Sequence, residues 1–250
     1  MRVGDHAAHD IILVVNEVRI AVVGDYAGTV NHRATTDAVA HVGAPTGIAT
    51  SVTWIATPDL EDATVATLSS FDAVWIAPGS PYRSMQGALA AIRTARTEQL
   101  PLIATCAGFQ HVVIEYARNV LGVGDAQHAE YDPNATRLFI TALDCSLAGV
   151  TMAVQLRADT TAAIAYGATE ATESYYCNFG LNPDCLADLQ DGGLVVSGVD
   201  QDGEVRVVEL PTHPFFVATL FVPQAASRAH APHPLVSAFV SAAVAARRPR

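Results

Sequence analysis

The sequence predicts an α/β fold of three layers, in which helices flank a mainly parallel central sheet. Short apolar runs rich in β-branched residues alternate with helical segments through the first half of the chain. Strands joined by helical crossovers pair in parallel, so this alternation favours a parallel sheet. The chain has 250 residues, 50% of them hydrophobic, which is enough to bury a substantial core.

The first half of the chain supplies the expected parallel strands and their helices. The strands are apolar runs that end at Gly or Pro turns, and they span 18–26, 50–57, 71–80 and 101–106. The helices between them span 31–43, 85–96 and 108–122, with Gly43 and Gly122 expected as helix ends.

The second half has shorter strands separated by Gly and Asp turns. They are expected at 136–143, 149–156, 192–200, 205–211 and 215–222. A closing helix follows at 232–247. Because no linker or shift of composition divides the chain, we expect residues 18–250 to form a single domain after an N-terminal extension, residues 1–17.

The charged residues exclude several function classes. The net charge is −11, and all 14 basic residues are arginines. Without lysine, neither a P-loop nor a Schiff base is possible. An acidic chain without a basic tract is a poor nucleic-acid binder, and no apolar run is long enough to cross a membrane. The N-terminus does not resemble a signal peptide, so a cytoplasmic protein is expected.

The four cysteines, at 106, 145, 177 and 185, include no CxxC pair. This pattern favours free thiols in a reducing compartment, with a Cys177–Cys185 disulfide as the alternative. No two His or Cys residues have a recognised metal-ligand spacing, so neither a metal nor another cofactor is predicted.

One cysteine, Cys106, stands where the expected strand 101–106 meets a helix. Ligands of parallel sheets bind beyond the carboxyl ends of the strands, and a nucleophile on a tight strand–helix turn projects there. The helix N-terminus would lower the pKa of the thiol, and Gly108 would permit close backbone approach. The alternative is a buried core thiol, which is common for free cysteine.

Four segments carry a resemblance to a known family. They are "PLIATCAGFQHVVIEYARNVLG" (101–122), "AEYD" (129–132), 192–224 and 227–243. The chain resembles the class I glutamine amidotransferases, specifically the glutaminase domain of the CTP synthase type. The resemblance implies a flavodoxin-like scaffold and a cysteine that forms a thioester with an amide carbonyl while ammonia leaves. The ATP-dependent synthetase domain of that type has no counterpart in this sequence.

The resemblance also implies roles for particular residues. Cys106 takes the position of the nucleophile. The backbone N–H of Ala107 and the turn at Gly79 and Ser80 take the position of the oxyanion hole, although the family has a second glycine where Ser80 stands.

Four further residues match or neighbour positions that hold the substrate. The family's ligands for the amino-acid end of the substrate correspond to Gln110 and Glu130. Asn178 falls where the family has the arginine that binds the substrate carboxylate, and Tyr176 lies beside it. We therefore expect an altered substrate.

The remaining triad positions are replaced. Val222 stands for the family histidine and Gln224 for the glutamate, and neither side chain can accept a proton from a thiol. The expected substitutes for the base or proton donor are His128, Tyr175 and Tyr176.

Three hypotheses follow. The first is a cysteine-dependent amidohydrolase or acyl-transfer enzyme whose partner is a small amide or amino-acid-like ligand rather than, or besides, glutamine. The second is a catalytically inactive binding or regulatory module. The third is other cysteine chemistry, such as hydratase, lyase or redox work. A homodimer or a separate partner enzyme is compatible with each of them.

Overall fold

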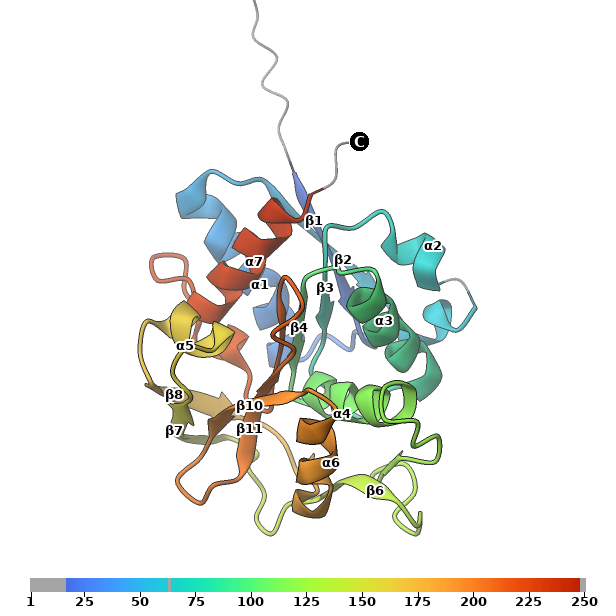
Figure 1. The fold of residues 1–250 in the computed structure, drawn as a ribbon. Coiled ribbons are helices and arrows are strands. Elements are labelled where there is room, and N and C mark those ends of the chain that lie inside the picture. Colours follow the sequence, from blue (N-terminus) through green and yellow to red (C-terminus); the bar gives the residue numbers. More distant parts are fainter. Residues whose placement is uncertain (1–16, 63, 248–250) are drawn as a thin grey trace, which may run out of the picture.

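The structure is a computed structural model, and it describes residues 17–62 and 64–247 (Figure 1). Its main feature is a nine-stranded sheet with the order β2-β1-β3-β4-β12-β11-β10-β7-β8. The expected N-terminal extension, residues 1–17, lies outside the described residues except for its last residue.

Five strands form the parallel half of this sheet. They are β2 (Thr50–Ile55), β1 (Val18–Val23), β3 (Ala73–Ile76), β4 (Leu102–Thr105) and β12 (Phe216–Thr219). Every neighbouring pair among them is parallel. All residues of β3, β4 and β12 are buried, as expected for strands with helices on both faces. The carboxyl ends of these strands therefore meet at one edge of the sheet.

Antiparallel pairs extend the sheet beyond β12. The strands are β11 (Val205–Glu209), β10 (Val195–Val199), β7 (Val150–Leu156) and β8 (Glu170–Tyr175). Because each pair from β12 to β8 is antiparallel, only β11 and β7 among the strands of this described sheet run against the rest. The expectation of a mainly parallel α/β sheet is confirmed.

A second, small sheet lies beside the fourth helix. It has the order β5-β6-β9, formed by β5 (Gln127–His128), β6 (Leu138–Ala142) and β9 (Phe179–Leu181). Both β6 and β9 contact α4 (Ala107–Asn119), so this sheet covers one end of the helix that begins at Cys106.

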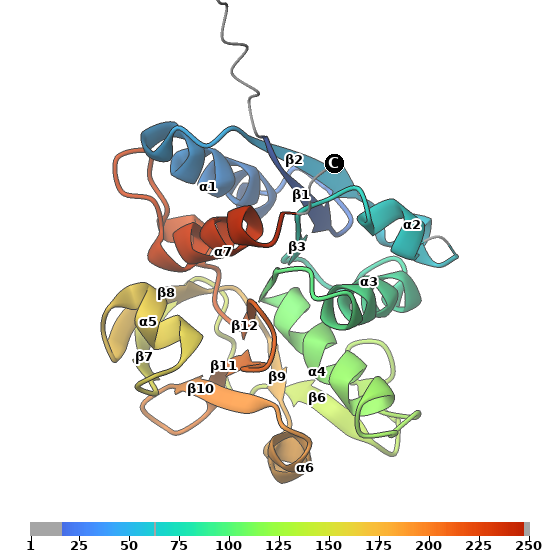
Figure 2. The same ribbon diagram turned by 45° about the horizontal axis from the view of Figure 1, so that its top comes forward.

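Helices cover both faces of the main sheet (Figures 1 and 2). On one face α1 (Val30–Thr46) packs against α7 (Pro234–Ala245), and on the other α3 (Met85–Thr97) packs against α4. Shorter helical segments complete the layers: η1 (Thr57–Leu60), α2 (Thr64–Leu68), α5 (Thr161–Tyr166), η2 (Pro183–Cys185), α6 (Leu186–Asp191) and η3 (Pro223–Ala226). Across the described part of the chain, no helix is both long and apolar enough to cross a membrane.

The ends expected for two helices are wrong: α4 ends at Asn119 rather than at Gly122, and the first helix runs past Gly43. Gly43 does not end the first helix, which continues to Thr46 and ends at Gly47, a residue in the left-handed region with φ 68°. The glycine at 43 serves packing instead, because a Cβ there would lie 2.8 Å from the carbonyl oxygen of Ile48. A glycine within a helical pattern thus marked a close approach rather than a cap.

The strand β8 was not expected from the sequence. Its residues, Glu170–Tyr175, are mostly polar and only Glu173 and Tyr175 are buried, so they lack the apolar run that identifies a core strand. Strand β8 pairs along its whole length with β7 at the edge of the sheet. It ends next to the segment 176–179, which contributes to the candidate site.

Gly108 fixes the approach of α4 to the sheet, and its replacement by alanine tests this contact. A Cβ at Gly108 would lie 2.5 Å from the carbonyl oxygen of Ile76 in β3, so the helix would have to shift. We expect Gly108→Ala to lower the free energy of unfolding by about 1–3 kcal/mol in chemical denaturation. Gly124→Ala is the matched control, because a Cβ there meets nothing within 4 Å. Equal losses in the two variants would contradict this account.

Candidate active site

Cys106 occupies a sharp turn between β4 and α4. Its backbone has φ 53° and ψ −108°, a conformation that a non-glycine residue adopts at a cost of about 1–3 kcal/mol. The turn is fixed because the Cys106 N–H donates to the carbonyl oxygen of Thr219 on the neighbouring strand β12, at 2.9 Å. The side chain therefore projects from the carboxyl edge of the sheet, as the sequence predicts.

A cavity of about 390 Å³ opens at this edge. Only 6% of Cys106 is exposed, and that surface faces a cavity formed by loops from several strands. The lining residues are Asp25, Ala27, Thr29, Asn31, His32, Pro78, Gly79, Ser80, Pro81, Cys106, Gln110, Glu130, Tyr176, Cys177, Asn178 and Phe179.

The thiol of Cys177 contacts the thiol of Cys106. The two Sγ atoms are 2.7 Å apart, and Cys177 Sγ also lies 3.3 Å from the carbonyl oxygen of Leu220. All four cysteines are free, so the alternative of a Cys177–Cys185 disulfide is wrong. No sequence pattern identifies the contact between Cys106 and Cys177, because the two cysteines are 71 positions apart in the chain.

In this contact Cys177 is the hydrogen-bond donor and Cys106 is the acceptor. The hydrogen bond from Cys177 lowers the pKa of Cys106, although burial opposes it. The same bond, together with burial, raises the pKa of Cys177 well above its ordinary value. Cys106 is therefore the more acidic thiol of the pair, and Cys177 is the less acidic one.

Two backbone N–H groups also stabilise the Cys106 thiolate. The N–H groups of Ala107 and Gly79 donate toward Sγ, which lowers the pKa of Cys106 further, whereas the negative charge of Glu130 raises it. Ala107 begins α4, whose N-terminus carries partial positive charge. Gly79 has φ +105°, so a glycine suits this position. Ser80 lines the cavity beside it.

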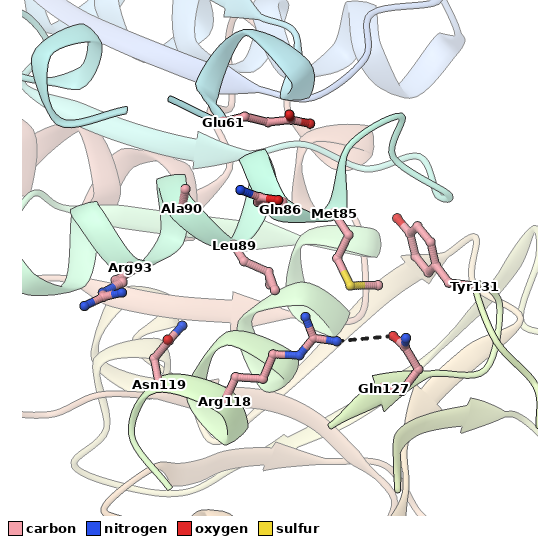
Figure 3. A pocket seen from close by; sticks show the side chains of 10 residues that line it. All are labelled: Glu61, Met85, Gln86, Leu89, Ala90, Arg93, Arg118, Asn119, Gln127 and Tyr131. Atoms are coloured by element: carbon pink, nitrogen blue, oxygen red, sulfur yellow. Dashed lines mark hydrogen bonds between the residues drawn. The ribbon is translucent and has the colours of Figure 1, made fainter. Parts of the chain in front are cut away.

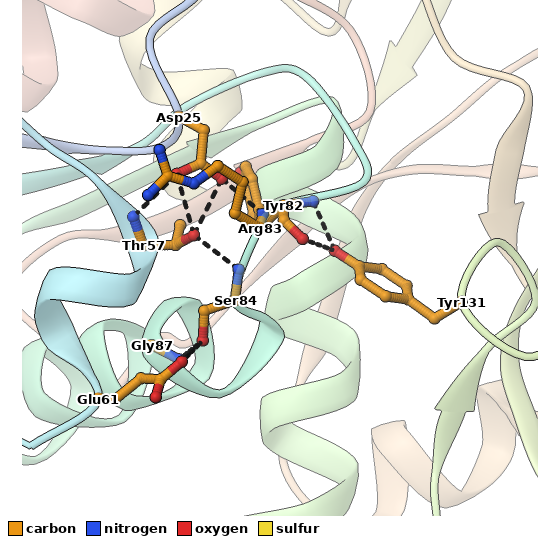
Figure 4. A network of polar contacts seen from close by, with 8 residues as sticks. All are labelled: Asp25, Thr57, Glu61, Tyr82, Arg83, Ser84, Gly87 and Tyr131. Carbon is orange, nitrogen blue, oxygen red and sulfur yellow. Dashed lines mark hydrogen bonds and ion pairs between the residues drawn. The ribbon is translucent and has the colours of Figure 1, made fainter.

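A polar network anchored on Asp25 holds the loop that presents Gly79 (Figure 4). The Asp25 carboxylate accepts a hydrogen bond from the backbone N–H of Arg83 at 2.6 Å and one from the backbone N–H of Thr57 at 3.1 Å. The Thr57 hydroxyl donates to the same carboxylate and accepts from the N–H of Ser84 at 2.9 Å. The carboxyl end of β1 is thereby tied to the residues that follow Gly79.

Tyr131 supports the same loop from the other side (Figure 4), and His111 contacts the Tyr131 hydroxyl. The Tyr131 hydroxyl accepts from the backbone N–H of Tyr82 at 2.7 Å and lies 3.0 Å from Nε2 of His111. His111 Nδ1 lies 2.7 Å from the carbonyl oxygen of Ala107. Burial lowers the pKa of His111 to about 4, so this imidazole is neutral at pH 7 and positions the start of α4.

His128, expected as a substitute base, does not line the cavity. It is fully buried, its Nδ1 accepts from the N–H of Glu130 at 3.0 Å, and its Nε2 lies 3.1 Å from Oε1 of Gln110. Burial lowers its pKa to about 3. With both ring nitrogens engaged, His128 orients Gln110 and the chain at Glu130 rather than facing Cys106.

Gln110 and Glu130 do reach the cavity. The Gln110 amide is fixed at both ends, because its Nε2 donates to the carbonyl oxygen of Phe179 at 2.9 Å while its Oε1 faces His128. Glu130 Oε2 is buried and has no hydrogen-bond partner among the residues that the structure describes. A carboxylate oxygen in this situation is poised to bind a positively charged ligand group.

The two tyrosines expected as proton donors lie in different places. Tyr176 is 40% exposed and lines the cavity. Tyr175 is fully buried outside the cavity lining, its ring packs edge-on against Phe221, and burial raises its pKa. Asn178 lines the cavity, and its Oδ1 accepts from the hydroxyl of Ser146 at 2.6 Å.

Neither Val222 nor Gln224 lines the cavity. Val222 is fully buried, and its N–H donates to the carbonyl oxygen of Ser174. The Gln224 amide donates to the hydroxyls of Thr35 and Thr105 at 3.2 and 3.3 Å. The Gln224 side chain thus has hydrogen-bond partners of its own, and neither residue makes a described hydrogen bond to Cys106.

His32 was not expected at the site and is the histidine that lines the cavity. Its Nδ1 accepts from the N–H of Ala27 at 2.9 Å, so Nε2 carries the proton that faces the carbonyl oxygen of Pro78 at 3.2 Å. Burial lowers its pKa. His32 thus fixes the turn before Gly79. It stands near the start of the helix α1 without any spacing pattern that could have identified it.

A second cavity, of about 690 Å³, lies beside α3 and α4 (Figure 3). Its lining consists of Glu61, Met85, Gln86, Leu89, Ala90, Arg93, Arg118, Asn119, Gln127 and Tyr131. Within the described residues it shares none with the Cys106 cavity and contains no cysteine. The described residues also contain no group of three or more His, Cys, Asp or Glu placed to hold a metal ion. The thiol pair therefore identifies the smaller cavity as the candidate active site.

Comparison with known proteins bears on the family and fold of the chain. The family model of class-I glutamine amidotransferases matches residues 30–242. CTP synthase from Sulfurisphaera tokodaii is 35% identical over 239 residues, which cover 91% of this chain and 45% of that protein. CTP synthase from Acidobacterium capsulatum is 36% identical over 246 residues, covering 93% and 45%. The chain thus spans about half the length of the curated relatives it matches.

A solved structure shows the same similarity in three dimensions. The glutaminase domain of Trypanosoma brucei CTPS, with bound acivicin, superposes with a TM-score of 0.85 at 25% sequence identity. The match covers 93% of this chain and 96% of that one, so the likeness extends over almost the whole described fold.

Replacing Asp25 by alanine tests whether the loop network sets the reactivity of Cys106. The variant leaves the N–H groups of Thr57 and Arg83 without their carboxylate, which releases the loop that carries Gly79. We expect the pKa of Cys106 to rise and alkylation by iodoacetamide at pH 7 to slow by up to about tenfold, equivalent to one pKa unit.

Arg83→Ala is the matched control. The Arg83 side chain is 65% exposed and 3.8 Å from Asp25, whereas the backbone N–H that donates to Asp25 is retained. An exposed ion pair contributes about 0–1 kcal/mol, so this variant should react like the wild type. If Arg83→Ala slowed alkylation as much as Asp25→Ala, the network would not act through the backbone.

Proposed function

The chain belongs to the class I glutamine amidotransferase family, and from this membership we propose that it is a cysteine-dependent amidohydrolase or acyl-transfer enzyme. Its substrate is a small amide other than, or besides, glutamine. Cys106 is the nucleophile, and Cys177 takes the part of the absent histidine. The observation that carries this proposal is the 2.7 Å contact between the two sulfur atoms at the cavity.

The contact supplies what a triad histidine supplies, namely an ionised nucleophile with a proton held nearby. A helix N-terminus contributes about 0.3–1 kcal/mol, less than one pKa unit, so it cannot activate a thiol alone. The hydrogen bond from Cys177 is the largest influence that lowers the pKa of Cys106. This hydrogen bond therefore favours the thiolate of Cys106 without an imidazole.

The proposed reaction has two steps. In the first, Cys106 Sγ attacks the amide carbonyl carbon, and the N–H groups of Gly79 and Ala107 stabilise the oxyanion. The C–N bond then breaks as Cys177 gives its proton to the leaving nitrogen, which forms a thioester and ammonia. In the second, the Cys177 thiolate takes a proton from water, and the resulting hydroxide cleaves the thioester to a carboxylate and restores Cys106.

The charges at the cavity support a substrate with an amino group and without a free α-carboxylate. No arginine is present among the described lining residues. Of the two lining carboxylates, Asp25 is paired with Arg83, whereas Glu130 Oε2 has no described partner. An ammonium group fits beside Glu130, and a second anion would be repelled. Gln110, Tyr176 and Asn178 supply polar contacts for the rest of the ligand.

The second candidate function is a catalytically inactive module that binds the same kind of ligand. Val222 and Gln224 favour it, because both side chains are buried at triad positions and neither lines the cavity. In that case the cavity would retain Glu130 and Gln110 for binding, and the thiols would be dispensable. Turnover measurements separate the two functions directly.

Ammonia release from a panel of amides tests the proposal. The panel comprises glutamine, asparagine and their α-amides and α-methyl esters, in a reducing buffer. We expect turnover of at least one α-blocked compound, complete loss in Cys106→Ala, and a fall of about 10²-fold in Cys177→Ala. Cys145→Ala is the matched control, since Cys145 is exposed and lies outside the cavity lining.

Two results would contradict the proposal. Release from no panel member above the Cys106→Ala background, with ligand binding retained in calorimetry, would establish the binding module instead. Full turnover in Cys177→Ala would remove Cys177 from the mechanism and transfer the proton-donor role to another lining residue.

A further inference from the structure

We propose that Cys106 and Cys177 are also a redox-active pair that reduces a small hydroperoxide and closes into a reversible disulfide. The inference does not depend on amide turnover. It concerns the same two sulfur atoms but a different reaction, with an oxidant as the co-reactant and a disulfide as the product.

The first support is proximity. The Sγ atoms are 2.7 Å apart, whereas a disulfide bond is about 2.05 Å long, so closure requires a small displacement. Both residues contact backbone carbonyl oxygens at the end of the same strand, β12. Cys106 N–H donates to Thr219, and Cys177 Sγ faces the carbonyl oxygen of Leu220, the next residue. The two sulfurs are therefore held together from segments 71 positions apart.

The second support is that the two thiols differ in the way a peroxide-reacting pair requires. The attacking cysteine must be a thiolate that a small oxidant can reach. Cys106 lines the cavity. Its sulfur accepts a hydrogen bond from the Cys177 thiol and is also approached by two backbone N–H groups. Cys177 is 2% exposed and is the less acidic thiol, which leaves Cys106 as the thiol that meets the oxidant first.

The proposed steps balance in atoms and electrons. The Cys106 thiolate attacks the terminal oxygen of ROOH, so an S–O bond forms, the O–O bond breaks, and the alkoxide takes a proton from water and leaves as ROH. Cys177 then attacks the Cys106 sulfenic acid sulfur. An S–S bond forms, the S–O bond breaks, and hydroxide leaves as water with the Cys177 proton. Two thiols are oxidised, one hydroperoxide is reduced, and an external dithiol reverses the change.

The other two cysteines provide an internal comparison. Cys145 is exposed, and Cys185 is partly exposed with a pKa raised by burial. Neither lines the Cys106 cavity. If the proposed pair is specific, these two thiols should stay reduced under conditions that oxidise Cys106 and Cys177.

The experiment treats the fully reduced chain with one molar equivalent of hydrogen peroxide, followed by thiol counting and intact mass and peptide mapping. We expect the loss of two of the four thiols, a mass decrease of two hydrogen atoms, and a crosslinked peptide that joins Cys106 to Cys177. Dithiothreitol should restore all four thiols. The double variant C145S/C185S should form the same Cys106–Cys177 crosslink and so lose both of its remaining thiols.

Two single variants separate the roles. Cys177→Ser should stop at the sulfenic acid, seen as the gain of one oxygen atom at Cys106 and as a dimedone adduct, with no disulfide. Cys106→Ser should consume peroxide at least about tenfold more slowly than the wild type. Circular dichroism spectra that match the wild type would show that both variants are folded.

Three results would overturn the inference. One is accumulation of sulfenic or sulfinic acid at Cys106 in the wild type without a disulfide. Another is a disulfide that involves Cys145 or Cys185 to the same extent. The third is a peroxide rate that is unchanged in Cys106→Ser. Each readout follows thiols rather than ammonia, so a chain without amide turnover could still pass this test, and an active amidohydrolase could still fail it.

Discussion

The backbone turn at Cys106 is the constraint on which the candidate site depends. A φ of 53° at a residue other than glycine costs about 1–3 kcal/mol, so the surrounding sheet must hold it. The hydrogen bond from Cys106 N–H to Thr219 and the close approach of Gly108 to Ile76 supply that restraint. The turn places the sulfur at the carboxyl edge of the parallel strands, within reach of the N–H groups of Ala107 and Gly79.

The thiol of Cys177 completes this arrangement with a single hydrogen bond. In place of an imidazolium, the Cys106 thiolate has a neutral donor that is itself buried and so remains protonated. The same geometry fits both proposed reactions, because a proton donor 2.7 Å from the Cys106 sulfur is also a second sulfur within reach of a sulfenic acid. In the proposed acyl transfer Cys177 gives its proton, and in the proposed peroxide reduction it gives an electron pair. Oxidation would also remove the nucleophile, so the two activities exclude one another in time.

Much of the fold could be predicted because its central strands are buried on both faces and appear as apolar runs. Cys106 was recognisable at the junction of such a run with a helix. Cys177 was not, because it follows β8, a polar edge strand. It reaches Cys106 because β8 pairs with β7 and because the Cys177 sulfur contacts Leu220, just after β12. His128 and Tyr175 are suitable by residue type, but both are buried: the ring nitrogens of His128 have partners, and Tyr175 lies outside the cavity lining. The sequence shows which side chains could take part in chemistry, whereas the contacts between residues far apart in the chain are known only from the structure.

The mechanism requires an acidic thiol at Cys106, and the ionisation of that thiol can be measured directly. Ultraviolet absorbance of the reduced protein, followed as a function of pH, reports thiolate formation in the wild type, Cys106→Ser and Cys177→Ala. In the wild type we expect one thiol to ionise with a midpoint pH below the ordinary pKa of cysteine. This ionisation should be absent in Cys106→Ser and displaced to higher pH in Cys177→Ala, because the main influence that lowers the pKa has been removed. A wild-type midpoint at or above the ordinary cysteine value, or one unchanged in Cys177→Ala, would contradict the account.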